Sequence, residues 1–184
     1  GTGYSLVLDA ARKHHSEALY QRAVDIALQA RSGDAALTAA QTWRKDLPES
    51  AEADRFVLKI LLALNRPGDT GPVLRSLLKR ASGGSEVNDS INAIPQAFAN
   101  VTDKALALKV VRDSLAPSLK LPASAAAAWT TIGRMELSQN LETEALTSTR
   151  NGQTADPASA FPALLALELM ERGIEGAEAL VKNQ

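Results

Sequence analysis

The sequence contains no cysteine, few aromatic residues and no surplus of either charge. The lack of cysteine excludes disulfide scaffolds, cysteine nucleophiles and thiolate metal sites. Lysine and arginine together number 20, against 21 aspartates and glutamates, so the formal net charge is −1. This balance argues against a dedicated nucleic-acid binder, which usually carries a basic excess. Aromatic residues make up 4% of the chain, which argues against an aromatic-rich β-sandwich.

Long apolar runs are also missing. The longest extends from Phe56 to Leu64 and is interrupted by Lys59. Because a membrane-spanning helix needs about 20 apolar residues, we expect no membrane insertion by this segment. The chain opens on Gly1 without a methionine, and we expect it to be a fragment of a longer protein.

Apolar residues recur at helical spacing along almost the whole chain. Leu19, Ala23, Ile26 and Ala27, for example, share one face of a helix. Proline, glycine and asparagine interrupt the pattern at short intervals and end each helix. The segments between them predict helices near 4–14, 16–31, 34–46, 50–65, 70–81, 86–100, 103–116, 123–139, 141–151, 158–172 and 174–183, with no convincing strand. The run 82–85 has the composition of a flexible linker.

The helices recur with a period. Glu144-Ala145-Leu146 returns as Glu178-Ala179-Leu180 after 34 residues. Prolines 48, 117 and 157 each follow an alanine by 12 residues. Such self-similarity is typical of repeat proteins, in which each unit buries its apolar face only against its neighbours.

Between Ala126 and Ser159 the chain resembles the tetratricopeptide repeat (TPR) family, whose unit is a helix–turn–helix of 34 residues. The residues that carry the likeness are Trp129, Ile132, Gly133, Ala145, Leu146 and Pro157. The resemblance implies an all-α fold, a right-handed superhelix (α-solenoid) of stacked antiparallel helix pairs, with about five repeats in a single domain over residues 1–184. The resemblance also implies that Gly133 lets the helix containing Ala145 approach the helix containing Trp129 closely.

A more distant likeness concerns the segments from Tyr4 to Arg12 and from Leu19 to Arg31, which are similar to proteobacterial TPR lipoproteins of the outer membrane. These envelope proteins dock partners, including processing proteases. The likeness implies a bacterial, periplasmic or outer-membrane-anchored protein. No lipidation signal accompanies it in this sequence, and a cytoplasmic location stays open.

Catalytic and metal-binding motifs find little support. Neighbouring helical residues point about 100° apart, so His14 and His15 are expected on a solvated helix end and not on one metal ion. There is no G-x-S-x-G elbow and no phosphate-binding loop. We therefore expect no enzyme activity and no cofactor. Trp43 and Trp129 lie on apolar helical faces and are expected in the core.

The function that the resemblance implies is a protein–protein interaction scaffold, which binds a partner peptide or helix in a concave groove. Two alternatives stay open: a helical accessory domain of a larger enzyme, or a part of an exopolysaccharide or pilus export system. Self-association through exposed terminal helices is a further expectation. The TPR pattern places the groove on the first helix of each unit. Its candidate residues here are Gln21, Asp25, Arg55, Lys59, Thr130, Arg134, Glu168 and Arg172, with Phe161 and Leu164 as nearby apolar anchors.

Overall fold

The computed structural model describes residues 2–81 and 83–182, and every regular element in these residues is a helix. The helices gather into two compact units, unit 1 over residues 1–80 and unit 2 over residues 81–184. No helix in the described ranges is both long enough and apolar enough to cross a bilayer. The prediction of an all-α fold built from packed helix pairs is confirmed, whereas the single domain over 1–184 stays a prediction.

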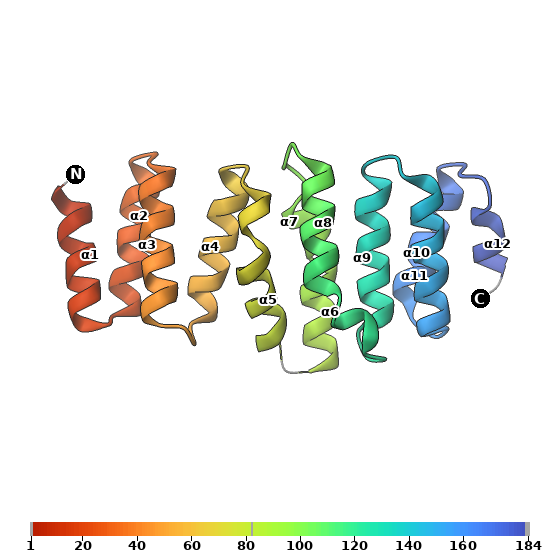
Figure 1. Ribbon diagram of the computed structural model, residues 1–184, viewed down its shortest axis with the longest axis horizontal. Helices are drawn as coiled ribbons and strands as arrows, with labels where there is room; N and C mark the ends of the chain where they lie inside the picture. Colours follow the sequence, from red (N-terminus) through yellow and green to blue (C-terminus); the bar gives the residue numbers. More distant parts are fainter. Residues whose placement is uncertain (1, 82, 183–184) are drawn as a thin grey trace. The chain divides into compact units, whose positions relative to one another are not determined.

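Unit 1 is a row of helices in which each packs antiparallel to the next (Figure 1). Its core contains Tyr20, fully buried and stacked on Trp43 with ring centroids 6.4 Å apart. Phe56 also packs against Trp43, with ring centroids 5.5 Å apart. The elements are α1 (Thr2–His14), α2 (Glu17–Gln29), α3 (Gly33–Asp46), α4 (Ala51–Ala63), the 3₁₀ turn η1 (Pro67–Asp69) and α5 (Gly71–Arg80).

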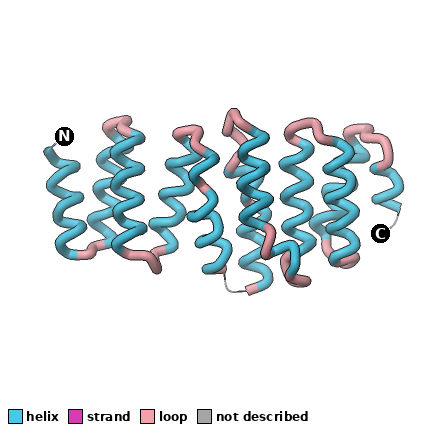
Figure 2. Tube along the Cα trace, in the orientation of Figure 1, coloured by secondary structure: helices cyan, strands magenta, loops and turns pink. Residues whose placement is uncertain are grey.

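Unit 2 is organised around α9, which packs against α6, α8, α10 and α11. Short loops join its helices (Figure 2). The elements are α6 (Gly84–Asn92), α7 (Ile94–Ala97), α8 (Lys104–Leu115), η2 (Ser118–Lys120), α9 (Ala125–Leu137), α10 (Glu142–Ala155), α11 (Ala160–Glu171) and α12 (Ala177–Lys182). Of the α9 residues, Trp129 and Arg134 are half-buried while most of the others are buried.

Five helices in the described residues end in the same kind of turn. The residues after α1, α2, α4, α9 and α11 have positive φ, which is 48° at His15, 55° at Arg31, 56° at Asn65, 60° at Asn140 and 73° at Gly173. After each one, a backbone N–H donates to the carbonyl five residues back, as in the bond from residue 32 to residue 27, which is the Schellman ending of a helix. We call α2, α4, α9 and α11 the first helices of their pairs, and α3, α5, α10 and α12 the second helices. In unit 2, α6 and α7 take the first position beside α9, and α8 takes the second.

Two segments differ from the sequence-based prediction. The helix expected over 86–100 is divided into α6 and α7, because Pro95, in the first turn of α7, cannot donate the backbone bond that would continue α6. Gly84 and Ser85, expected in a linker, belong to the first turn of α6. Ser82 of the same linker lies outside the described residues.

Glycines set the close approach of α9 to its neighbours. A Cβ built on Gly133 would lie 3.4 Å from the Ser148 Cβ on α10 and 2.8 Å from the Leu165 Cδ2 on α11. The predicted close contact at Gly133 is therefore confirmed. Gly152 of α10 likewise allows a close approach, since a Cβ there would lie 3.1 Å from the Pro162 Cβ. The TPR pattern in the sequence did not indicate this position.

Candidate functional site

Three of the eight predicted groove residues meet in one pocket of unit 2. Arg134 of α9 pairs with Glu168 of α11, and Arg172 reaches the same carboxylate at 3.0 Å. The pocket has a volume of about 340 Å³. We call it the first-helix pocket, because α6, α7, α9 and α11 supply its walls. It is lined by Asn92, Pro95, Gln96, Arg134, Leu137, Ser138, Glu168 and Arg172.

The charges of the first-helix pocket are partly compensated. Glu168 lies between two guanidinium groups, so the three side chains together carry one net positive charge. Leu164 sits one turn before Glu168 on α11 and is 56% exposed. The pocket can therefore offer hydrogen-bond donors, one excess cation and a neighbouring apolar contact to an arriving chain.

The other predicted groove residues are not brought to this pocket. Thr130 is 2% exposed and donates its hydroxyl hydrogen to the Ala126 carbonyl of its own helix, so a partner cannot reach it in this structure. In unit 1, Arg55 pairs with Glu52 of the same helix. Gln21, Arg55 and Lys59 are exposed on α2 and α4, and Asp25 is half-buried.

The expected exposure of the terminal helices is only partly observed. Leu6 of α1 is 66% exposed, whereas Leu180 of α12 is 2% exposed. The apolar surface near the end of unit 2 belongs instead to α11, which exposes Leu164, Leu167 and Met170. Self-association stays a prediction.

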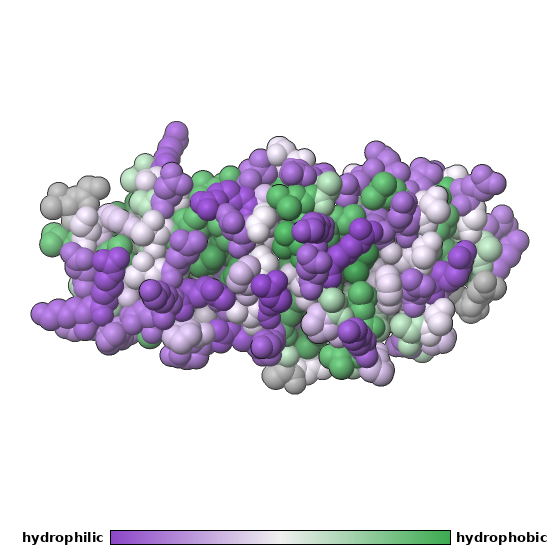
Figure 3. Space-filling model, viewed as in Figure 1, coloured by the Kyte–Doolittle hydropathy of each residue, from purple (hydrophilic) through white to green (hydrophobic). Residues whose placement is uncertain are grey.

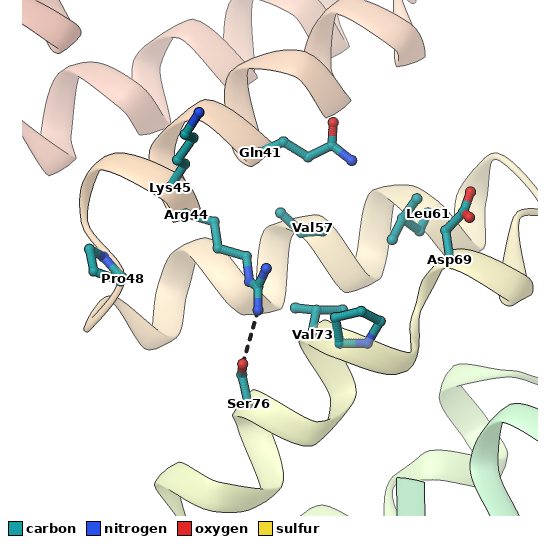
Figure 4. Close-up of a pocket in the computed structure, with 10 residues that line it drawn as sticks. Gln41, Arg44, Lys45, Pro48, Val57, Leu61, Asp69, Val73 and Ser76 are labelled. Carbon is teal, nitrogen blue, oxygen red and sulfur yellow. Dashed lines mark hydrogen bonds between the residues drawn. The ribbon is translucent and has the colours of Figure 1, made fainter. Parts of the chain in front are cut away.

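A second kind of concavity lies between successive second helices, and no pattern in the sequence indicated it. In unit 1, the α3–α5 groove has a volume of about 590 Å³ (Figure 4). Val57 and Leu61 of α4 form its floor, with α3 and α5 as its walls. Its lining residues are Gln41, Arg44, Lys45, Pro48, Val57, Leu61, Asp69, Pro72, Val73 and Ser76.

Unit 2 repeats this arrangement. The α8–α10 groove has a volume of about 450 Å³ and a floor formed by Trp129, Ile132 and Glu136 of α9. Trp43 is fully buried as expected, but Trp129 is half-buried because it lines this groove. The full lining consists of Arg112, Leu119, Trp129, Ile132, Glu136, Thr143, Glu144, Thr147, Ser148 and Asn151.

A buried carboxylate lies beneath each of these grooves. In unit 1 the side chain of Asp54 is 1% exposed and accepts from Arg44 Nε at 2.7 Å and from Arg80 Nε at 2.9 Å. In unit 2, Glu136 accepts from Arg112 Nη2 at 2.6 Å and from the Ser148 hydroxyl. A buried charge needs such partners to offset its desolvation. Each carboxylate therefore ties the second helices on both sides of the groove to the first helix beneath them.

Of the two adjacent histidines, His15 contacts a carboxylate of α3. His15 Nδ1 lies 2.7 Å from Asp46 Oδ1, and the Tyr20 hydroxyl donates to Asp46 Oδ2 at 2.6 Å. The bond from Tyr20 holds the pKa of Asp46 below its ordinary value. Burial, reinforced by the bond to Asp46, raises the pKa of Tyr20. These contacts join α2 to the end of α3.

Comparisons with known proteins add little to this description of the pocket and the two grooves. No family model and no curated protein matches the chain. Among solved structures, the chain is similar to "MamA RS-1 ArsTM double mutant", with 16% sequence identity and a TM-score of 0.42 over 90% of this chain and 88% of that one. At this distance the likeness gives no information on function.

Proposed function

We propose that this chain is a protein-interaction scaffold, and that unit 2 binds a peptide or helix of a partner protein along its first helices. The observation that supports this is the first-helix pocket, where Arg134, Glu168 and Arg172 from two neighbouring helices converge beside the exposed Leu164. Charged groups at the rim of an interface contribute specificity and steering, while apolar anchors contribute affinity.

The chemistry of the pocket suggests which ligand fits. Glu168 neutralises one of the two arginines, so the patch is not a clamp for a strongly acidic tail. One carboxylate of the partner can pair with the remaining cation, while Asn92, Gln96 and Ser138 offer hydrogen bonds to a peptide backbone. We expect a segment with an apolar residue near Leu164 and a single acidic residue near Arg172.

The test is capture of partners with the full chain and with the double variant Arg134→Glu/Arg172→Glu. Envelope extract is the first source to use, because the resemblance to outer-membrane lipoproteins points there. The control is Glu142→Lys, which also reverses a charge on an exposed residue but lies outside the pocket. We expect the double variant to lose a partner that the wild type and the control retain, with unchanged helicity by circular dichroism. A partner that binds all three proteins equally would show that the first-helix pocket is not the binding surface.

A further inference from the structure

The α8–α10 groove lies on the opposite face of α9 from the first-helix pocket. Residues two apart in a helix differ by about 200° in direction, so Ile132 and Glu136 point away from the side where Arg134 meets Glu168. The groove is therefore a surface separate from the one proposed above. On the face shown in Figure 3, apolar surface is visible between α8 and α10, with hydrophilic side chains around it.

The two walls of the α8–α10 groove carry opposite charges. Arg112 stands on the α8 wall with its side chain 45% exposed, although one of its nitrogens is bound to Glu136. Glu144 stands on the α10 wall and is exposed. Between them the floor consists of the apolar side chains of Trp129 and Ile132, together with the Glu136 carboxylate that is paired with Arg112. An occupant that matches this surface has an apolar side chain between an acidic and a basic group.

The α3–α5 groove of unit 1 shares part of this arrangement. Arg44 and Lys45 stand on the wall of the preceding second helix, and the floor is apolar (Figure 4). Apolar surface shows between α3 and α5 in Figure 3 as well. The acidic residue of this groove, Asp69, comes from η1 and is paired with Arg66. The cationic wall and the apolar floor therefore recur in both units, whereas an exposed acidic wall is particular to the α8–α10 groove.

The walls are held in place before anything binds. The Glu136 carboxylate joins Arg112 of α8 to Ser148 of α10. In unit 1, Arg44 donates to Ser76 across the groove at 3.0 Å, as the dashed line in Figure 4 shows. A binding surface that is already ordered loses less conformational entropy when it takes up a ligand.

From these observations we propose that the α8–α10 groove is a second docking site, for a peptide segment of a protein partner that inserts an apolar side chain over Trp129. An acidic residue of this segment pairs with Arg112 and a basic residue with Glu144. Walls of opposite charge disfavour a polyanion such as a nucleic acid. The apolar floor requires an anchor residue, as in other peptide-binding grooves.

In the experiment, peptides that bind the full chain are selected from a random linear-peptide phage library. The selected peptides are synthesised, and their affinity is measured by calorimetry. Three variants are compared. Glu144→Lys reverses the charge of the α10 wall, and Thr147→Trp fills the groove from an exposed position. Glu142→Lys is the matched control, because it makes the same charge change on the opposite face of α10.

We expect selected peptides to combine an apolar anchor with an acidic and a basic residue. Their affinity should fall about tenfold or more in Glu144→Lys and in Thr147→Trp, and remain unchanged in Glu142→Lys. Replacing the basic residue of the peptide by an acidic one should restore binding to Glu144→Lys. The proposal is overturned if no peptide is selected, or if both groove variants bind the peptides like the wild type. The double variant Arg134→Glu/Arg172→Glu of the first-helix pocket is measured with the same peptides. Peptides that lose affinity only in that variant would also overturn the proposal, while supporting the first-helix pocket.

Discussion

The close contact at Gly133 allows a quantitative prediction. In Gly133→Leu, the new Cβ would lie 2.8 Å from Leu165 Cδ2 and 3.4 Å from Ser148 Cβ, and three further carbons would follow it into the same space. Leu165 is fully buried and has little room to move. Overpacking of this kind costs about 1–3 kcal/mol. For a protein of this length, that corresponds to a fall in melting temperature of roughly 2–12 °C.

Gly133→Ala separates packing from helix propensity. Alanine gains about 1 kcal/mol over glycine inside a helix. This gain offsets the free-energy cost of displacing the Leu165 methyl group. We therefore expect the free energy of unfolding to change by no more than about 1 kcal/mol. The control is Gly84→Leu, because a Cβ built on Gly84 meets no atom within 4 Å. It should leave the stability nearly unchanged.

The assay is urea unfolding followed by circular dichroism, together with a double-mutant cycle. In a Leu165→Ala background the space beside residue 133 is larger. There, Gly133→Leu should cost at least about 1 kcal/mol less than it does in the wild type. The packing argument is refuted if Gly133→Leu unfolds like the wild type. It is equally refuted if the two substitutions are additive within about 0.5 kcal/mol, the usual limit for independent sites.

Much of the fold could be predicted from the sequence, because the relevant signals are local. Apolar spacing and helix breakers located the helices, except at Pro95, where the two sides of a proline were read as one helix. Asn65, Asn140 and Gly173 mark turns that need positive φ, a conformation that glycine and asparagine adopt readily. Arg31 adopts the same conformation at the equivalent turn, and its side chain gives no such signal.

The first-helix pocket was partly predictable from the repeat period. Arg134 and Glu168 are 34 residues apart, so the period places them at equivalent positions on neighbouring first helices, where they pair. The grooves between second helices were not predictable from the period. Arg112 meets Glu136 over 24 residues, and that contact depends on how far apart α8 and α10 lie. The same spacing leaves Trp129 half-buried, although its position in the pattern is that of a core residue.

Three further predictions concern unit 1. Asp54→Ala removes the shared partner of Arg44 and Arg80. It should lower the free energy of unfolding in urea by about 3 kcal/mol. This value is the low end for a broken buried pair, because both arginines reach solvent. Asp69→Ala, which breaks an exposed pair with Arg66, should cost no more than about 1 kcal/mol; equal costs would contradict the importance of the buried carboxylate. Arg31→Gly should raise stability by about 0.5–1 kcal/mol, because glycine relieves the positive φ, whereas Arg31→Val should lower it, and the opposite order in melting temperature would contradict this assignment. Asp46 should make unit 1 sensitive to acid. Its folded pKa is lowered, first by the hydrogen bond from Tyr20 and then by His15, so its ionised form stabilises the fold at pH values above the ordinary aspartate pKa of about 3.9. This contribution is lost as the pH falls through the lowered folded pKa. Asp46→Asn can still accept from Tyr20 but does not titrate, so its stability should depend less on pH below about 4. Urea midpoints of the two proteins measured from neutral to acidic pH provide the check, and parallel curves would show that Asp46 does not contribute to the acid sensitivity.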